Sequence, residues 1–206
     1  TSVTGSISGS AGLAIYASVG LSVAVNTVVN NTTAYISGSE VSAGHDLTLD
    51  AENLSVLGSL SVGGQAAVYA AVGGAVGVNT VANTTSAFIT GLGNASACKV
   101  TADNIDIIAN DLSVSGSVTG AINGAAFAAV GGAVSVSTIA DTVEAYIDSS
   151  TVVCSDELAI SADNLAVIGN IAISAQGAIA GVGGSVAVST LANTTNAYIA
   201  GSDITS

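Results

Sequence analysis

The sequence has 206 residues, half of them hydrophobic, with 25 glycines and no proline, methionine or tryptophan. Its formal net charge is −13, because 14 acidic residues stand against one basic residue, Lys99, and this balance argues against binding to nucleic acids or anionic membrane surfaces. The lack of proline favours long strands, since proline removes a backbone donor from a sheet.

Four uncharged stretches have the length of membrane helices, but their periodicity is wrong for helices. From Leu13 to Val25, apolar residues alternate with small or polar ones, which is the period of a β-strand. Glycine pairs such as Gly73–Gly74 and the abundant valine also disfavour a helix. We therefore predict strands and no transmembrane segment in these four stretches, which are Ala11–Val29, Gly63–Ala82, Ala121–Ala140 and Ala175–Ala192.

The chain repeats itself at a spacing of 53 residues, with Leu54–Gly91 aligned to the start of the chain. Further units begin at Leu112 and Leu165, and the second unit is longer because of extra residues around Gly91–Lys99. The predicted single repeat domain therefore has units 1–53, 54–111 and 112–164 and an incomplete unit 165–206.

All seven aromatic residues fall into two columns of this alignment. Such columns are needed where successive turns of a parallel β-solenoid stack about 4.8 Å apart. We predict an all-β fold, a parallel β-solenoid (a β-helix or β-arcade) of about four repeats with one turn per unit. The first stacked column is Tyr16, Tyr69 and Phe127, with Ile179 in the fourth unit, and the second is Tyr35, Phe88, Tyr146 and Tyr198. Two polar columns accompany them, Asn26, Asn79, Ser137 and Ser189, and Asn30, Asn83, Asp141 and Asn193.

Charged residues are confined to one part of each unit. Residues 1–25, 54–78, 112–136 and 165–188, here called the uncharged half, contain none, and the remainder is called the acidic half. We expect the uncharged half to be covered on both faces and the acidic half to face water. The chain arcs are expected at the glycine pairs and at the "NTT" and "ADN" segments. Aspartate at Ala75 and Ala133 would test association through the uncharged faces.

The segment Val41–Leu54, "VSAGHDLTLDAENL", resembles the repeats of filamentous-haemagglutinin-type secreted adhesins, and Asn104–Leu112 and Ser155–Leu165 are looser copies. The segment Gly183–Ser202 is similar to repeats of giant bacterial surface proteins of the β-strand-repeat kind. The resemblance covers nearly the whole chain. It implies a right-handed β-solenoid on the outside of a cell.

Residues for catalysis are scarce, since the chain has one histidine, His45, and one lysine. An enzyme needs positioned acids, bases and nucleophiles, so we predict no enzymatic activity, no catalytic residue and no cofactor. Asp148, Asp156 and Glu157 are read as solubilising acids. The Asp and Asn of the "AEN", "AND" and "ADN" segments have oxygen atoms that suit calcium. A turn role is favoured for them, and no metal site is predicted.

Covalent modification is predicted at two kinds of residue. Cys98 and Cys154 occupy similar parts of successive units, so we predict a disulfide between them, with bonds between chains or free buried thiols as alternatives. Three "NTT" segments carry sequons and are candidate glycosylation acceptors, at Asn30, Asn83 and Asn193.

These features predict an extracellular structural protein that assembles with itself, through its open strand ends and uncharged faces, into an amyloid-like cell-surface filament, tube or sheath. The partner would be another copy of the chain, not a nucleic acid. The alternative is a stalk segment of a large secreted adhesin. A third class, a carbohydrate-binding or ice-binding solenoid, is not supported. The sequence lacks the repeated exposed Thr-x-Thr or aromatic face that such binding requires.

Overall fold

The computed structural model describes residues 1–205, Ser96 by its backbone only, and Ser206, the predicted end of the fourth unit, lies outside the described residues. Almost all of this chain is strand, apart from a short 3-10 helix, η1 (Ala95–Ala97). No helix among the described residues is long and apolar enough to cross a membrane. The strands are β1 (Ser2–Ala14), β2 (Ala17–Ser37), β3 (Glu40–Ser42), β4 (Asp46–Ala67), β5 (Ala70–Thr90), β6 (Lys99–Ala125), β7 (Ala128–Ile139), β8 (Thr142–Asp148), β9 (Thr151–Gly177), β10 (Ala180–Leu191), β11 (Thr194–Ala200) and β12 (Asp203–Thr205).

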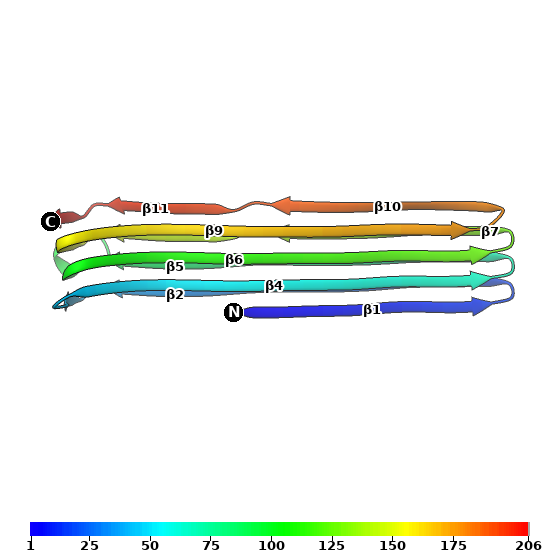
Figure 1. Ribbon diagram of the computed structural model, residues 1–206, viewed down its shortest axis with the longest axis horizontal. Coiled ribbons are helices and arrows are strands. Elements are labelled where there is room, and N and C mark those ends of the chain that lie inside the picture. The colour runs from blue at the N-terminus through cyan, green and yellow to red at the C-terminus, as the bar shows by residue number, and fades with distance from the viewer. Residues whose placement is uncertain (206) are drawn as a thin grey trace.

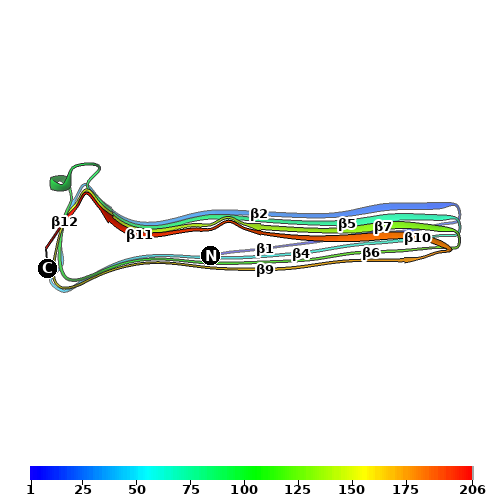
Figure 2. The ribbon, with the colours of Figure 1, turned by 90° about the horizontal axis from the view of Figure 1, so that it is seen from above.

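The strands form two parallel sheets that face each other (Figures 1 and 2). The first sheet has the order β1-β4-β6-β9-β12, with β3 also beside β6. The second sheet has the order β10-β7-β5-β8-β11, with β2 also beside β5. The chain alternates between the sheets, so that β1, β4, β6 and β9 are each followed by strands of the second sheet. The fold is therefore all-β and parallel, as the alternating pattern predicts.

Strand register follows the predicted spacing. Asn26 pairs with Asn79, 53 positions along the chain. Asn53 pairs with Asp111, 58 positions along. The extra residues of the second unit lie between β5 and β6, where η1 forms. The insertion therefore leaves the ladder on both sides of it in register.

Of the segments predicted as chain arcs, the "ADN" at 102–104 lies at one, since the Asp103 N–H bonds the His45 carbonyl beside the bulge between Ala102 and Asn104. At one end of the molecule the chain crosses between sheets at two-residue bends, of which Ile15–Tyr16 and Val68–Tyr69 are examples. The Gly73–Gly74 pair and the "NTT" segment at Asn83 lie inside β5 instead. The reason is packing, since a Cβ atom on Gly73 would overlap the Asn123 side-chain oxygen. Glycine is needed there for close approach of side chains from the other sheet, not for turning.

The interior of the acidic half is a hydrophobic core. Aliphatic side chains from both sheets fill it, and the alternate residues of the same strands, such as Asp50 and Glu52, face water. This is the usual arrangement of a strand that is buried on one face. The largest fully buried residues of this core are Ile89, Ile105, Ile107, Ile147, Val100, Val143 and Val152.

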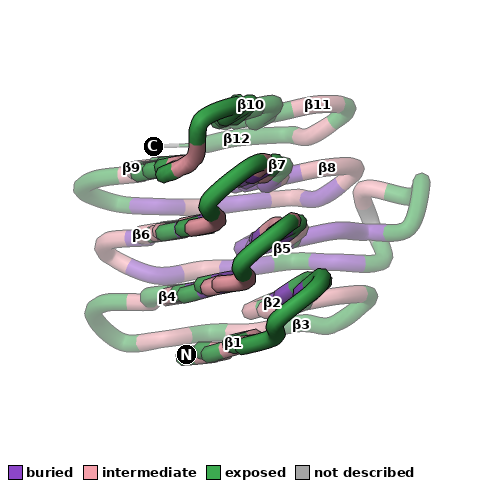
Figure 3. The backbone as a smooth tube through the Cα atoms, turned by 90° about the vertical axis from the view of Figure 1, so that its right-hand side faces the viewer, coloured by how far each residue is buried: buried purple, intermediate pink, exposed green. Residues whose placement is uncertain are grey.

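The interior of the uncharged half is mostly polar or small, contrary to the expected uniform cover. Ser22 and Ser61 lie inside and are joined by a hydrogen bond of 2.9 Å. At the border with the acidic half, Asn26 donates to the Gly58 carbonyl and to the Asn79 side chain at 2.9 and 3.0 Å. These bonds satisfy the groups that form them, across the two sheets and along the ladder, whereas the buried hydroxyls of Ser115 and Ser135 have no partner. Figure 3 shows that burial is concentrated in the central strands.

Candidate functional site

The outer face of the second sheet is apolar over the uncharged half. Inward and outward residues alternate along β2, and Val19 on its outward side is 77% exposed. Equivalent valines stack on it through the parallel register, and the same occurs at Val23. The outward columns are Val19, Val72, Val130 and Val182, all exposed, and Val23, Val76, Val134 and Val186, of which Val76 is half-buried.

The outer face of the first sheet has an apolar ridge beside a glycine groove. The ridge is the stacked column Ile7, Leu60, Val118 and Ile171, of which Ile7 is 85% exposed. The groove runs alongside it over the glycine column Gly5, Gly58, Gly116 and Gly169. Ridge and groove both follow the strand-to-strand direction, so a surface with the same repeat can interlock with them. Together, the outward columns of the two sheets form the outer apolar faces.

Ala75 and Ala133 do not belong to these faces. Both are buried, between neighbours that point outward. An aspartate there would disrupt the interior and not a surface, so these positions cannot test association. The neighbouring outward residues Val76 and Val134 are the ones that can.

The outermost strands of the described chain have one unpaired backbone edge. In the first sheet, β1 is the edge strand of the first layer. In the second sheet, β10 and β11 are the edge strands of the last layer. The side chains of β10 are exposed throughout, with no charge among them. An unprotected edge of this kind is a template for a further parallel strand.

The predicted aromatic columns are stacked ladders. Phe88 stacks on Tyr35 and on Tyr146, with ring centroids 5.3 and 4.8 Å apart, and Tyr146 stacks on Tyr198 at 5.0 Å. Tyr69 stacks on Tyr16 and Phe127 at 5.7 and 5.4 Å. The second ladder lies beside acids, and burial, followed by the nearby Tyr198, raises the pKa of Tyr146.

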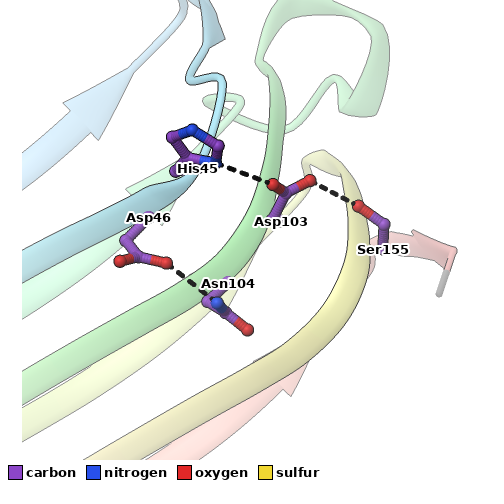
Figure 4. Close-up of polar contacts among 5 residues, drawn as sticks. All are labelled: His45, Asp46, Asp103, Asn104 and Ser155. Carbon is purple, nitrogen blue, oxygen red and sulfur yellow. Dashed lines mark hydrogen bonds and ion pairs between the residues drawn. The ribbon is translucent and has the colours of Figure 1, made fainter.

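His45, Asp103 and Ser155 lie next to each other on successive strand layers (Figure 4). The His45 Nδ1 atom is 3.3 Å from Asp103 Oδ2, and the Ser155 hydroxyl donates to Asp103 Oδ1 at 2.8 Å. The Ser155 hydroxyl bond and then the His45 bond lower the pKa of Asp103. Because the aspartate stands between the serine and the histidine, the imidazole does not contact the hydroxyl that it would have to deprotonate. The three exposed side chains therefore link neighbouring layers where the chain bends.

The predicted disulfide is wrong, because both cysteines are free and buried in the structure. Cys154 pairs with Ala102, whereas Lys99, which follows Cys98, pairs with Thr151. The two cysteines are therefore four residues out of register, about 13 Å along the strand direction. A disulfide requires Cα atoms within about 7 Å. Burial of both thiols also opposes bonds between chains.

The "NTT" asparagines form an interior column, which contradicts a glycosylation role for Asn83. Its side chain is 2% exposed and donates to the hydroxyls of Ser55 and Ser113, both at 3.0 Å. Asn30 and Asn193 bond to Asn53 and Asn164 in the same way, at 3.2 and 3.0 Å. Modification at Asn30 and Asn193 stays a prediction.

No group of three or more His, Cys, Asp or Glu side chains among the described residues is arranged to hold a metal ion. The chain matches no protein-family model, and comparisons with curated proteins and with solved structures found no match. The outer apolar faces are the candidate functional site.

Sequence reasoning missed that the uncharged half has its polar residues inside and its apolar residues outside. A signal was present, since the stacked column at Asn26 and the stacked valines fall on opposite strand parities. Because neither the odd-numbered nor the even-numbered residues of these strands carry a charge, charge alone did not indicate which of the two sets faces inward.

Proposed function

We propose that this chain is an extracellular structural protein, a parallel β-solenoid of about four repeats that assembles with its own kind into a cell-surface filament, tube or sheath. The observation that carries this proposal is the pair of outer apolar faces.

The outer apolar faces support sideways association. Exposed apolar surface of this extent marks an interaction site, and covering ~1,000 Å² of it contributes on the order of 25 kcal/mol before the cost of association. The sheets also have little twist (Figure 1). Flat sheets are usually stabilised by stacking on another sheet. The acids lie in the other half, so their repulsion opposes this contact weakly at physiological salt.

The strand edges support growth along the stacking direction. The register of each strand pair is the same simple translation, so another parallel layer fits on β1 or on β10 without changing the fold. The resemblance of Val41–Leu54 to secreted adhesin repeats supports an extracellular location.

The test is the double substitution Val76→Asp and Val134→Asp, which places two charges in one outward column. We expect loss of sheets or filaments in electron microscopy and a shift to small species in sedimentation, with the circular dichroism spectrum of a β protein retained. The control is Thr48→Asp with Thr84→Asp, which adds the same charge at exposed positions outside the outer apolar faces and should leave assembly intact. Unchanged assembly of the valine variant would contradict the proposal.

The alternative function, a stalk segment of a large adhesin, is favoured by one observation. The same open edges accept further repeats of the same chain as readily as another molecule. Determining the intact gene product distinguishes the two. Many more units in one chain, together with a monomeric product in sedimentation, would favour the stalk.

A further inference from the structure

Two columns of Asn and Asp side chains face each other inside the molecule. One belongs to the first sheet and contains Asn53, Asp111 and Asn164. The other belongs to the second sheet and contains Asn30, Asn83, Asp141 and Asn193. Hydrogen bonds between side-chain amides join the two columns in two layers. The Asn30 amide donates to Asn53, and the Asn193 amide donates to Asn164.

The central layer differs because both columns carry an acid there. Asp111 is 4% exposed and Asp141 is 1% exposed. The Asp141 carboxyl accepts the Asn83 backbone N–H at 2.9 Å, the Asn83 amide donates to the Ser113 hydroxyl, and that hydroxyl donates to Asp111. The chain therefore buries two carboxyl groups against each other.

Nearby oxygen atoms surround this pair. Asp111 accepts hydrogen bonds from the Asn53 amide, from the Ser113 hydroxyl at 3.0 Å and from the Thr85 hydroxyl at 3.4 Å. Two buried acceptors have no hydrogen-bond partner, Asp141 Oδ2 and Asn83 Oδ1. Buried acceptors without donors are costly. The Asn164 amide of the neighbouring layer also has a buried Nδ2 without a partner, but it bonds neither acceptor, so this layer lacks an electropositive group that would satisfy them.

No basic side chain supplies that group. Lys99 is the only Lys or Arg of the chain and is exposed, and His45 is bonded to Asp103 at the arc. In the neighbouring layers an Asn–Asn pair is neutral by itself. Two carboxylates here carry a charge of −2, which one divalent cation would neutralise.

We propose that Asp111 and Asp141 hold one Ca²⁺ ion between the two sheets. The side-chain oxygens of Asn83 and Ser113 complete the set of ligands available from the protein. Calcium takes several oxygen ligands of mixed type in flexible geometry, whereas magnesium demands a near-ideal octahedron and keeps its waters. A buried set of carboxylate, amide and hydroxyl oxygens suits calcium. Because the pair is buried, the ion enters as the chain folds.

The experiment compares the whole chain, refolded with EGTA or with Ca²⁺, by equilibrium dialysis with ⁴⁵Ca and by thermal unfolding. We expect one Ca²⁺ bound per chain and a Tm about 5 °C higher than in EGTA. The double variant Asp111→Asn with Asp141→Asn reproduces the Asn–Asn pair of the neighbouring layers. It should fold, lose the ion and show the same Tm in both buffers.

The matched control is Asp50→Asn with Asp203→Asn, which removes the same charge from exposed positions and should bind Ca²⁺ as the unmodified chain does. Three results would overturn the proposal. In the first, no ion binds and the Tm is equal in both buffers. In the second, the Asp111→Asn with Asp141→Asn variant still binds the ion. In the third, an equal concentration of Mg²⁺ displaces the bound Ca²⁺. If added Ca²⁺ does not bind and the loss of stability with rising pH is the same with Ca²⁺ as with EGTA, the pair shares a proton instead and the proposal is overturned.

Discussion

At the scale of single residues, the interior of this molecule is unusual because it buries many asparagine and serine side chains beside its hydrophobic core. Asn26, Asn79 and Asn83 are buried, and each donates a side-chain hydrogen bond inside the molecule. Asparagine and serine can occupy such positions because a stacked column presents each amide with donors and acceptors from the layers above and below. The balance is incomplete at Asn83 Oδ1 and at Asp141 Oδ2, which are buried without a hydrogen-bond partner.

The pH dependence of stability should report on Asp141. Burial, together with the neighbouring Asp111, raises the pKa of Asp141 from 3.8 to about 6. The folded chain then holds this proton more tightly than the unfolded chain, so the stabilisation is complete below pH 3.8 and is lost as the pH rises through 6. Without divalent cations we expect a loss on the order of 2–3 kcal/mol between pH 4 and pH 7.

Urea unfolding of the unmodified chain and of Asp141→Asn in EGTA measures this effect, because the other carboxyl groups contribute to both proteins. The difference between the two free energies of unfolding should change in favour of the variant as the pH rises. A difference that stays constant from pH 4 to pH 7 would refute the assignment to Asp141.

At the scale of elements, each strand is stabilised chiefly by its copies in the neighbouring layers. The long ladders between β4, β6 and β9 keep one register over almost their whole length, interrupted by a bulge between Ala102 and Asn104. A side chain placed well in one layer is therefore placed well in all of them, and ring stacking is the clearest case.

Replacing Phe88 should measure the value of a ladder. Phe88→Leu keeps most of the apolar area but removes two stacking contacts, with Tyr35 and Tyr146. We expect a loss of about 1–2 kcal/mol in the free energy of unfolding. Tyr16→Leu, at the end of the other ladder, removes the single contact with Tyr69 and should cost about half as much. Urea denaturation of both variants checks this order, and equal costs would contradict a stacking origin.

At the scale of the whole molecule, the acidic half and the uncharged half distribute their polar and apolar residues in opposite ways. The acidic half has an apolar core and a charged surface, as a protein that stays in water requires. The uncharged half has the reverse arrangement, with hydrogen bonds inside and valines, leucines and isoleucines outside. In the proposed assembly, this asymmetry would direct association to the outer apolar faces.

Proteolysis should show where the folded molecule is open. The segment between β5 and β6 is the longest stretch outside the strands in the described chain, and Leu92, Gly93 and Asn94 in it are exposed. Ladder hydrogen bonds protect the remainder from local opening. We expect a broad-specificity protease to cut first within residues 92–97 and trypsin to cut slowly at Lys99, at the start of β6. Mass spectrometry of early fragments checks this, and first cuts within β4 or β6 would contradict it.

The sequence by itself determined the strand period, the spacing of the repeat and the two aromatic columns. These are local or translational properties: the alternation from Leu13 to Val25 is readable within one strand, and a parallel ladder reproduces the alignment of Tyr35 with Phe88 directly. Length and composition were enough to exclude helices, because glycine and β-branched residues disfavour them.

Only the tertiary structure decided which strand parity faces inward and which residues meet across the sheets. In the uncharged half both parities lack charge, so the usual rule of apolar residues inside gave no correct guide. The serines and asparagines are inside because the facing sheet and the next layers supply their hydrogen-bond partners. The register also separated Cys98 from Cys154, since the chain rejoins the ladder at Lys99 opposite Thr151. Asp111 and Asp141 meet because their strands belong to opposite sheets, a relation that no local pattern contains.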